Sequence, residues 1–204
     1  MTSANSTNSL AVEDLGSAAQ RDRRKRILDA TIALASQGGF DAVQMRAVAE
    51  RADVALGTLY RYFPSKIHLL VSALQREFER TEVALRDKPL EGDTTAERVI
   101  AVLKRTTRGM QSDPQLTEAL TRAFMFADAS VAAEIHQVGM LLTSMLTQAM
   151  YPEGHAEVTD EDVQIARVIG DVWLSALVGW VTGRNSAAET GQQIEVAVKL
   201  LLRD

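Results

Sequence analysis

The sequence predicts an all-α protein of about nine helices, with a three-helix helix-turn-helix domain ahead of a larger helical domain. Apolar residues recur at the spacing of helix faces along most of the chain, and no window shows the sustained alternation of a half-buried strand. Helix start signals also recur. Three segments resemble capping boxes, namely Thr94-x-x-Glu97, Thr159-x-x-Asp162 and Ser186-x-x-Glu189.

The first predicted helix covers residues 20–37. Its apolar side chains share one face, and they are Ile27, Leu28, Thr31, Ile32, Leu34 and Ala35. Gly38-Gly39 follows directly and supplies the C-terminal stop. Residues 1–19 are polar and acidic, so we expect a disordered arm there. This arm lacks the basic region and apolar stretch of a secretory signal.

Two short helices and a longer one come next. Residues 44–52 and 56–63 each have a helical apolar pattern, and the turn between them is only a few residues long. Such an arrangement is typical of a helix-turn-helix. Pro64-Ser65 ends the second of these helices, and Ser65 is a candidate N-cap for a helix from Lys66 to about Leu85.

The second half of the chain reads as five further helices. The capping boxes and the Asp113-Pro114 pair, an N-cap followed by proline at the first helical position, place their starts. The expected ranges are 95–112, 114–126, 129–151, 160–183 and 187–203. Residues 20–66 therefore form the helix-turn-helix domain, the helix from Lys66 is the connector, and residues 67–204 form the larger domain.

Charge is distributed unevenly along the chain. The net charge is −5, but residues 20–66 hold nine Lys and Arg against five Asp and Glu, whereas residues 67–204 hold 13 against 20. A basic segment on an acidic body is expected where one end meets phosphate and the rest stays away from it.

The residue inventory argues against several other classes. There is no cysteine, which excludes disulfides and thiolate metal sites within this sequence. His68, His136 and His155 fall in no hydrolase or metalloenzyme motif, so we expect no enzyme, no cofactor and no metal site. The apolar tract of residues 163–181 contains Arg167 and Asp171, which disfavours a membrane span. We expect a cytoplasmic protein.

The third helix and its neighbours carry the features of a DNA-reading element. Its N-terminus is built from small residues such as Gly57 and Thr58, which can approach a groove closely. Tyr60 and Tyr62 have hydroxyls that can reach backbone oxygens, and Lys66 adds a cation. Arg46 presents a fork of donors suited to guanine O6 and N7.

The segment of residues 40–66 resembles the signature of the TetR family of transcriptional repressors. Gln44 replaces the usual threonine, and Asp53 stands where glycine is common. The resemblance implies groove contacts from Arg46, Leu56 and Gly57, and a recognition helix held by two buried residues, Leu59 and Phe63. It implies phosphate contacts from Gln44, Thr58, Tyr60, Tyr62 and Lys66. It also makes residues 67–204 an effector-binding and dimerisation domain.

Large soft side chains in the second domain suit an apolar effector pocket between helices. The candidates are Met110, Phe124, Phe126, Met140, Trp173, Leu177 and Trp180. Each of them is also compatible with an ordinary core position.

Residues 117–130 and 165–175 resemble those of family members that repress sterol catabolism. This implies release from a palindromic operator by a steroid coenzyme A thioester. Four cations of the residue 95–112 helix could meet its phosphates, and they are Arg98, Lys104, Arg105 and Arg108. A fatty acyl thioester or another apolar ligand is an alternative effector. A helical ligand-binding protein with no DNA function is the alternative class.

Two apolar stripes predict a homodimer through the last two helices. The stripe on the residue 160–183 helix is Ile165, Val168, Ile169, Val172, Ala176, Gly179 and Gly183. The stripe on the residue 187–203 helix is Ile194, Ala197, Val198 and Leu201. The alternative is that both stripes pack on the core of their own domain.

Overall fold

The computed structural model describes residues 4–86, 91–151 and 157–203, and within these ranges the regular elements are all helices. The all-α prediction is therefore confirmed for the described residues. The α-helices are α1 Ala4–Ala42, α2 Met45–Arg51, α3 Leu56–Tyr62, α4 Lys66–Arg86, α5 Thr95–Gln111, α6 Pro114–Met125, α7 Ala132–Met150, α8 Asp160–Val181 and α9 Ala187–Leu201. A short 3₁₀ helix, η1 Ala129–Val131, precedes α7.

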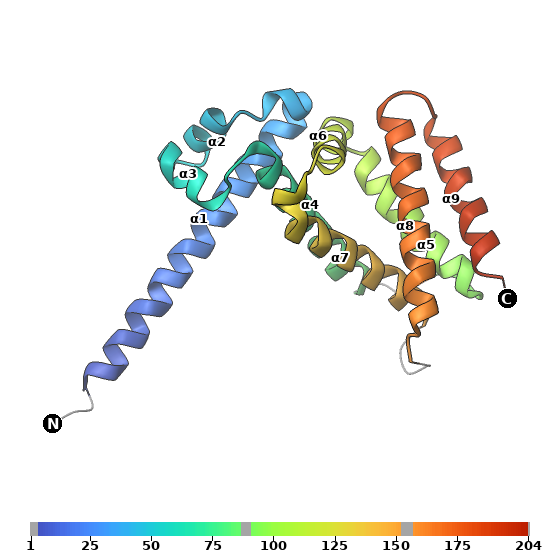
Figure 1. Cartoon of the computed structure of the whole chain (residues 1–204), viewed down its shortest axis with the longest axis horizontal. Helices are drawn as coiled ribbons and strands as arrows, with labels where there is room; N and C mark the ends of the chain where they lie inside the picture. The colour runs from blue at the N-terminus through green and yellow to red at the C-terminus, as the bar shows by residue number, and fades with distance from the viewer. Residues whose placement is uncertain (1–3, 87–90, 152–156, 204) are drawn as a thin grey trace.

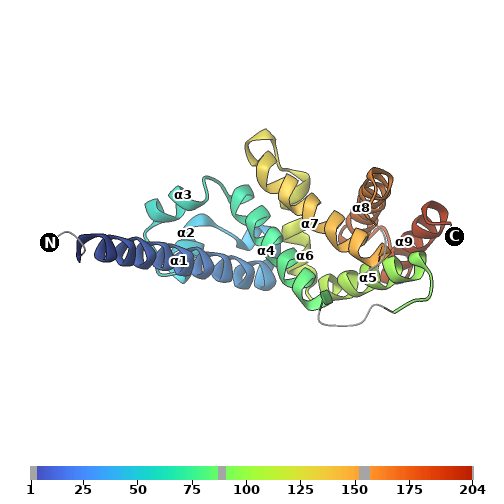
Figure 2. The same ribbon diagram turned by 90° about the horizontal axis from the view of Figure 1, so that it is seen from below.

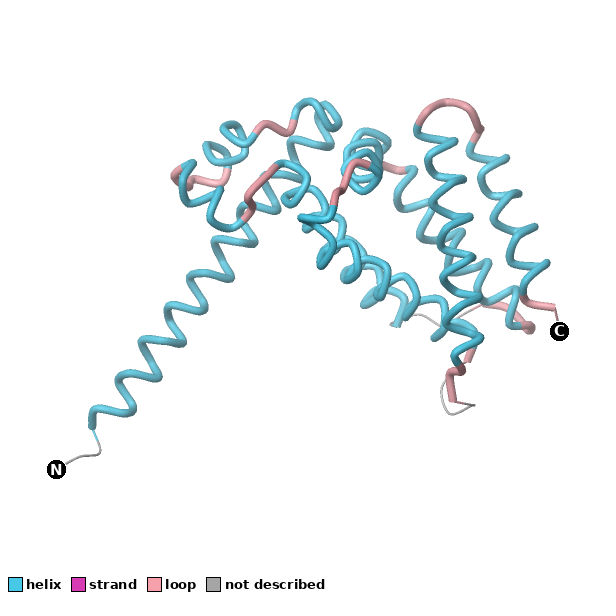
Figure 3. The backbone as a smooth tube through the Cα atoms, viewed as in Figure 1, coloured by secondary structure: helices cyan, strands magenta, loops and turns pink. Residues whose placement is uncertain are grey.

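The helices form two groups joined by α4 and α6 (Figure 1). Helices α1, α2 and α3 lie at one end with the start of α4, and α5, α8 and α9 lie at the other. The view turned by 90° (Figure 2) shows the same order along the molecule. Short loops join most neighbouring helices (Figure 3). Helices α4 and α6 are thus the elements through which the two groups are connected.

Helix α1 differs from the prediction at its N-terminal end and agrees with it near the other. Its backbone is helical from Ala4, so residues 4–19 are not the disordered arm that we expected. Once a helix has nucleated, each added residue gains a backbone hydrogen bond, and no proline interrupts this stretch. At the other end, Gly38 and Gly39 have non-helical backbone angles, which confirms the predicted stop before a final helical turn.

The predicted caps of the later helices are confirmed. All three boxes form both reciprocal hydrogen bonds, at Thr94, Thr159 and Ser186. The Asp113 side chain accepts from the backbone N–H of Leu116, beside Pro114. These bonds satisfy N–H groups that a helix start leaves without partners.

The predicted helix over residues 129–151 is divided in two. The Asp128 carboxylate accepts from the backbone N–H of Ser130 and caps η1 first, so α7 starts at Ala132. His68, in the first turn of α4, contacts this corner. Its ring Nδ1 lies 2.9 Å from Ser65 Oγ, and its Nε2 lies 3.0 Å from the Ser130 carbonyl oxygen of η1. His68 therefore holds two elements together.

Helix α8 is apolar and long enough to cross a membrane by length and composition alone. It packs instead against α7 and α9, with Ile169, Trp173 and Leu177 at most 3% exposed. These contacts explain its hydropathy as that of a core helix.

Candidate DNA-binding surface and effector pocket

Two buried side chains fix the orientation of α3. Leu59 is fully buried and Phe63 is 3% exposed, as predicted, and both belong to the apolar core that α1 and α2 share with them. Val43 and Val48 complete the same core. Because Leu59 faces inward, the opposite face of α3 is turned to solvent.

The turn between α2 and α3 uses an aspartate where the family pattern has glycine. Asp53 has a φ of 53°, in the left-handed region that glycine adopts at least cost and that aspartate tolerates better than most residues. Arg26 Nη1 donates to the carbonyl oxygen of Ala52 at 2.7 Å and so ties the turn to α1. The substitution of glycine by Asp53 therefore leaves the tight turn intact.

The side chains expected to contact DNA fall into two groups by exposure. Gln44, Arg46 and Gly57 are exposed, Leu56 is 40% exposed and Tyr60 is 47% exposed. Thr58 and Tyr62 are half-buried, and the Tyr62 ring lies 6.3 Å from the Phe63 ring, centroid to centroid. Five of the predicted residues thus lie on the solvent side of α2 and α3.

Arg46 is held only weakly in the free protein. Its Nε lies 3.5 Å from Glu50 Oε1, and both side chains are largely exposed, at 84% and 72%. An exposed pair of this kind contributes little to stability. The guanidinium is therefore free to exchange this partner for a base or a phosphate.

Lys66 differs from the expected simple phosphate contact. Its ammonium lies 3.8 Å from the centroid of the Phe40 ring, and the Arg122 guanidinium carbon lies 4.4 Å from the same centroid. Burial lowers the Lys66 pKa, nearby Asp41 opposes this, and Arg122 adds to it. Reaching a phosphate would require this ammonium to leave the ring.

Phe40 also bonds to α6 through its backbone. Its N–H donates to Glu118 Oε2 at 2.8 Å, and Arg122 Nη1 lies 3.5 Å from both Glu118 Oε1 and Asp41 Oδ2. We call Phe40, Lys66, Glu118 and Arg122 the α1–α6 joint. It connects the end of α1 and the start of α4 to one face of α6. Sequence reasoning missed it because its members are up to 82 positions apart.

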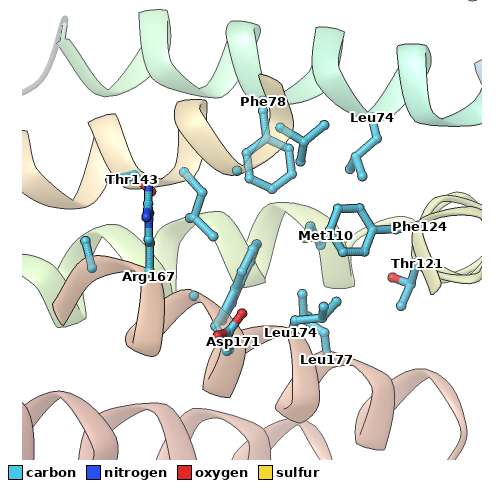
Figure 4. A pocket seen from close by; sticks show the side chains of 16 residues that line it. Leu74, Phe78, Met110, Thr121, Phe124, Thr143, Arg167, Asp171, Leu174 and Leu177 are labelled. Carbon is cyan, nitrogen blue, oxygen red and sulfur yellow. The ribbon is translucent and has the colours of Figure 1, made fainter. Parts of the chain in front are cut away.

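An apolar cavity of about 160 Å³ lies between α4, α5, α6, α7 and α8. Four predicted residues line it, namely Met110, Phe124, Trp173 and Leu177. Figure 4 shows Phe78 and Leu74 entering from α4, and Leu174 and Leu177 from α8. We call this space the inner chamber. Its walls suit an apolar ligand.

Three predicted pocket residues lie elsewhere. Phe126 is 69% exposed and Met140 is 49% exposed, and Trp180 is half-buried but does not line the inner chamber. Helical position explains these errors, because Phe126 lies just past the end of α6 and Met140 follows Gly139, which lines the chamber. Composition identified the right helices and could not identify the facing sides.

Other wall residues escaped the sequence reasoning. Leu74 and Phe78 come from α4, and Leu142 and Thr143 come from α7. The apolar spacing of α4 predicts a buried face but cannot tell a packed face from a cavity wall. Trp173 is fixed by an indole N–H that donates to Thr107 Oγ1 at 2.8 Å and by an edge-on contact with Phe78.

The four cations of α5 have different surroundings. Arg98 donates to the carbonyl oxygens of Ala149 and Met150, and so serves the end of α7. Lys104 Nζ lies 2.8 Å from Glu195 Oε2, and Arg108 Nε donates to the carbonyl of its own helix at Lys104. Arg105 donates to the Ala84 carbonyl oxygen, and of the four it is the one that borders the cavity between α4, α5 and the start of α6.

The two apolar stripes predicted to form the dimer interface are partly buried within the chain itself. Ile169, Ala176 and Gly179 of α8 are buried, and so are Ile194 and Val198 of α9. The alternative of packing on the same domain is therefore correct for these residues. The apolar side chains left exposed on these two helices are Val168, Val196, Leu200 and Leu201.

Two family models match the chain. Residues 27–73 match the model described as bacterial regulatory proteins, tetR family, and residues 92–201 match the tetracyclin repressor-like C-terminal domain. The second match covers more than half of the 204 residues. The chain belongs to the TetR family. The helix-turn-helix of α2 and α3 is thus the DNA-binding element of a TetR-family regulator, and the inner chamber lies in its C-terminal domain.

Curated TetR-family relatives match nearly the whole chain. It is 59% identical over 195 residues to an HTH-type transcriptional repressor KstR of Rhodococcus jostii, covering 96% of this chain and 90% of the relative. It is 55% identical to the KstR repressor of Mycobacterium tuberculosis, covering 96% and 87%.

Solved structures of other TetR-family members share the fold. A regulator from Rhodococcus sp. RHA1 superimposes with a TM-score of 0.82 at 34% identity, covering 91% of this chain and 97% of that one. A FadR repressor from Thermus thermophilus, in complex with lauroyl-CoA, gives a TM-score of 0.67 at 19% identity, covering 88% and 93%. The second likeness establishes the fold alone.

Proposed function

We propose that this TetR-family regulator is a cytoplasmic repressor of sterol-catabolism genes that binds a palindromic operator as a homodimer. A steroid coenzyme A thioester in the inner chamber releases it. The similarity to KstR repressors over nearly the whole chain supports the class of genes. The apolar walls of the inner chamber support an apolar effector.

The main support for this proposal is that α6 contacts both the inner chamber and the DNA-binding domain. Thr121 and Phe124 line the inner chamber, whereas Glu118 and Arg122 of the same helix belong to the α1–α6 joint. A ligand that moves α6 therefore acts directly on the end of α1 and the start of α4. The loss of DNA affinity then equals the difference in ligand affinity between the two conformations.

The size of the inner chamber bears on the effector. Its volume of about 160 Å³ is below the roughly 300–1,000 Å³ of sites for drug-sized ligands. A steroid or a long acyl chain must therefore displace side chains of the chamber wall. Because α6 contributes some of these side chains, we expect the displacement to move α6. A ligand with equal affinity for both conformations would shift no equilibrium.

Operator binding with and without a thioester tests the proposal. The protein is titrated with its own upstream promoter fragment at one fixed salt concentration, because phosphate contacts make affinity salt-dependent. We expect specific binding that a cholesterol-derived coenzyme A thioester abolishes. Tight binding that ignores the thioester would refute this effector, and absence of specific binding to that promoter would move the search to other operators.

A fatty acyl thioester is the second candidate effector. The fold is shared with a repressor in complex with lauroyl-CoA, and a flexible chain enters a narrow apolar chamber more easily than rigid rings do. Thermal shift with matched panels of acyl and steroidal thioesters separates the two. Stabilisation by acyl members alone would decide against the steroid.

Arg46→Ala is expected to cost about 1–3 kcal/mol of operator binding, concentrated at one base pair. The reason is that its exposed guanidinium can form a bidentate contact in the groove. The control is Tyr60→Phe, which removes an exposed hydroxyl expected at phosphate and should weaken all sequences alike. Equal losses on operator and random DNA for Arg46→Ala would refute base reading.

Phe124→Ala is expected to weaken effector binding about tenfold, because the variant loses a phenyl ring that lines the inner chamber. Phe126→Ala provides a matched control, since Phe126 is two positions away and 69% exposed. Calorimetric titration of each variant with the effector gives the comparison. Equal affinities for both variants would show that the ligand binds elsewhere.

The homodimer is proposed through α8 and α9, with exposed Val168, Leu200 and Leu201 as the apolar contacts in place of the buried Ile194 and Val198. A paired surface of this kind fits the two-fold symmetry of a palindromic operator. Sedimentation of the purified chain tests it, and a monomer at micromolar concentration would contradict it.

A further inference from the structure

A second cavity lies beside the inner chamber, between α4, α5 and the start of α6. It has a volume of about 330 Å³ and is bordered by Arg80 and Ala84 of α4, Arg105 and Gly109 of α5, and Leu116 of α6. We call it the outer chamber. Its lining includes four charged residues, namely Glu77, Arg80, Arg105 and Asp113.

Side chains rather than backbone separate the two chambers. Leu74, Phe78 and Met110 line both of them. Met110 is half-buried, and methionine has an unbranched side chain with three rotatable bonds. Such a side chain can change its rotamer without movement of the helix that carries it. Figure 4 shows Met110 near Phe124 among the residues that line the inner chamber.

The charges of the outer chamber leave one cation available for an anion. Glu77 and Arg80 face each other at 2.9 Å, and the Asp113 carboxylate accepts the backbone N–H of Leu116. Arg105 donates to the carbonyl oxygen of Ala84 at 3.1 Å, and among the described residues no carboxylate lies within salt-bridge distance of it. Its positive charge is therefore not neutralised locally.

The wall of the inner chamber carries charges of both signs. Asp171 and Arg167 of α8 line it, and among the described residues no ion pair joins either of them to an opposite charge. Asp171 would repel a phosphate placed beside it. The inner chamber, at about 160 Å³, is also too small to hold an entire thioester.

We propose that the effector spans both chambers, with its apolar body in the inner chamber and its phosphate-bearing end in the outer chamber against Arg105. Met110 is the gate between them. This inference rests on the proposed thioester effector and adds the direction in which that ligand lies. Arginine suits the role because its planar group binds phosphate through two donors.

Three glycines allow each chamber to be probed with a single thiol. Gly109 borders the outer chamber, Gly139 borders the inner chamber, and Gly191 lies at a distant site on α9. A Cβ at any of the three meets nothing within 4 Å, and the chain has no native cysteine. Gly109→Cys, Gly139→Cys and Gly191→Cys thus each carry one reporter thiol.

The readout is the rate of thiol alkylation, with a cholesterol-derived coenzyme A thioester, an acyl coenzyme A and their free acids as probes. At about ten times Kd, a thioester should slow Gly109→Cys and Gly139→Cys about tenfold, because only the unliganded fraction reacts. A free acid should slow Gly139→Cys alone. Gly191→Cys should react at an unchanged rate throughout.

The outcomes separate this inference from the proposed function. Thioester protection of Gly139→Cys with Gly109→Cys left reactive would overturn the two-chamber arrangement while keeping the effector. No protection of either thiol by any thioester would overturn the proposed effector class and this inference together. Protection of both by thioesters, and of one by the acids, supports both.

Arg105→Gln gives an independent test by affinity. It should weaken binding of the thioester about tenfold and leave the free acid unchanged, because a charge-assisted contact to phosphate is lost. Arg108→Gln is the matched control, being exposed on the same helix and bonded to the Lys104 carbonyl. Equal thioester affinities in both variants would contradict a phosphate contact at Arg105.

Discussion

Leu59→Ala is expected to destabilise the helix-turn-helix domain by about 2–5 kcal/mol and to abolish operator binding. Leu59 is fully buried and faces the core that holds α3 against α1 and α2, so truncation leaves a cavity beneath the recognition helix. Urea unfolding and operator titration on the same preparation measure the two effects. Effector binding in the larger domain should persist.

Tyr60→Ala is the control for this prediction. Tyr60 is adjacent to Leu59 but 47% exposed, so its loss should change stability by no more than about 0.5 kcal/mol while removing the phosphate contact that we expect from its hydroxyl. Operator binding should then weaken without unfolding. A Leu59→Ala protein that bound the operator with native affinity would show that α3 is held by contacts outside this core.

Gly39→Ala is expected to cost about 1–3 kcal/mol of stability and to break the α1–α6 joint. Gly39 has φ 65° and ψ −158°, a conformation that L side chains rarely adopt. An added Cβ would also lie 2.7 Å from Glu118 Oε2. The carboxylate must then move away from the Phe40 N–H, which removes the hydrogen bond between α1 and α6.

We expect Gly39→Ala to uncouple effector binding from operator binding. In Gly39→Ala the effector should bind with near-native affinity yet reduce operator affinity by a smaller factor than in the native protein, because α6 no longer moves the end of α1. Titration of operator binding at several effector concentrations measures that factor. An unchanged factor would exclude the joint from signal transmission.

Gly183→Ala isolates the contribution of backbone strain. Gly183 has a similar φ of 70°, but an added Cβ there meets nothing within 4 Å. The Gly183→Ala variant should lose stability through backbone strain alone and should keep the native response to effector. The response to effector, rather than the loss of stability, is therefore the readout on which the two variants are compared.

Local signals in the sequence determined the helices and the DNA-binding element. Each capping box lies within four consecutive residues, and the recognition segment is continuous from Phe40 to Lys66. Burial of Leu59 and Phe63 was implied by the family resemblance of that segment, and the structure confirms it. Hydrogen bonds and side-chain periodicity at this range are set by the sequence itself.

Only the tertiary structure decided the pocket, the joint and the orientation of the dimer stripes. The inner chamber takes side chains from five helices, and Phe126 and Met140 were misplaced because composition does not say which face of a helix meets a cavity. Lys66 was expected at phosphate, yet its ammonium lies on Phe40 beside Arg122. Which apolar face is a wall, a core or a partner surface depends on how helices distant in sequence pack together, and no local pattern encodes that packing.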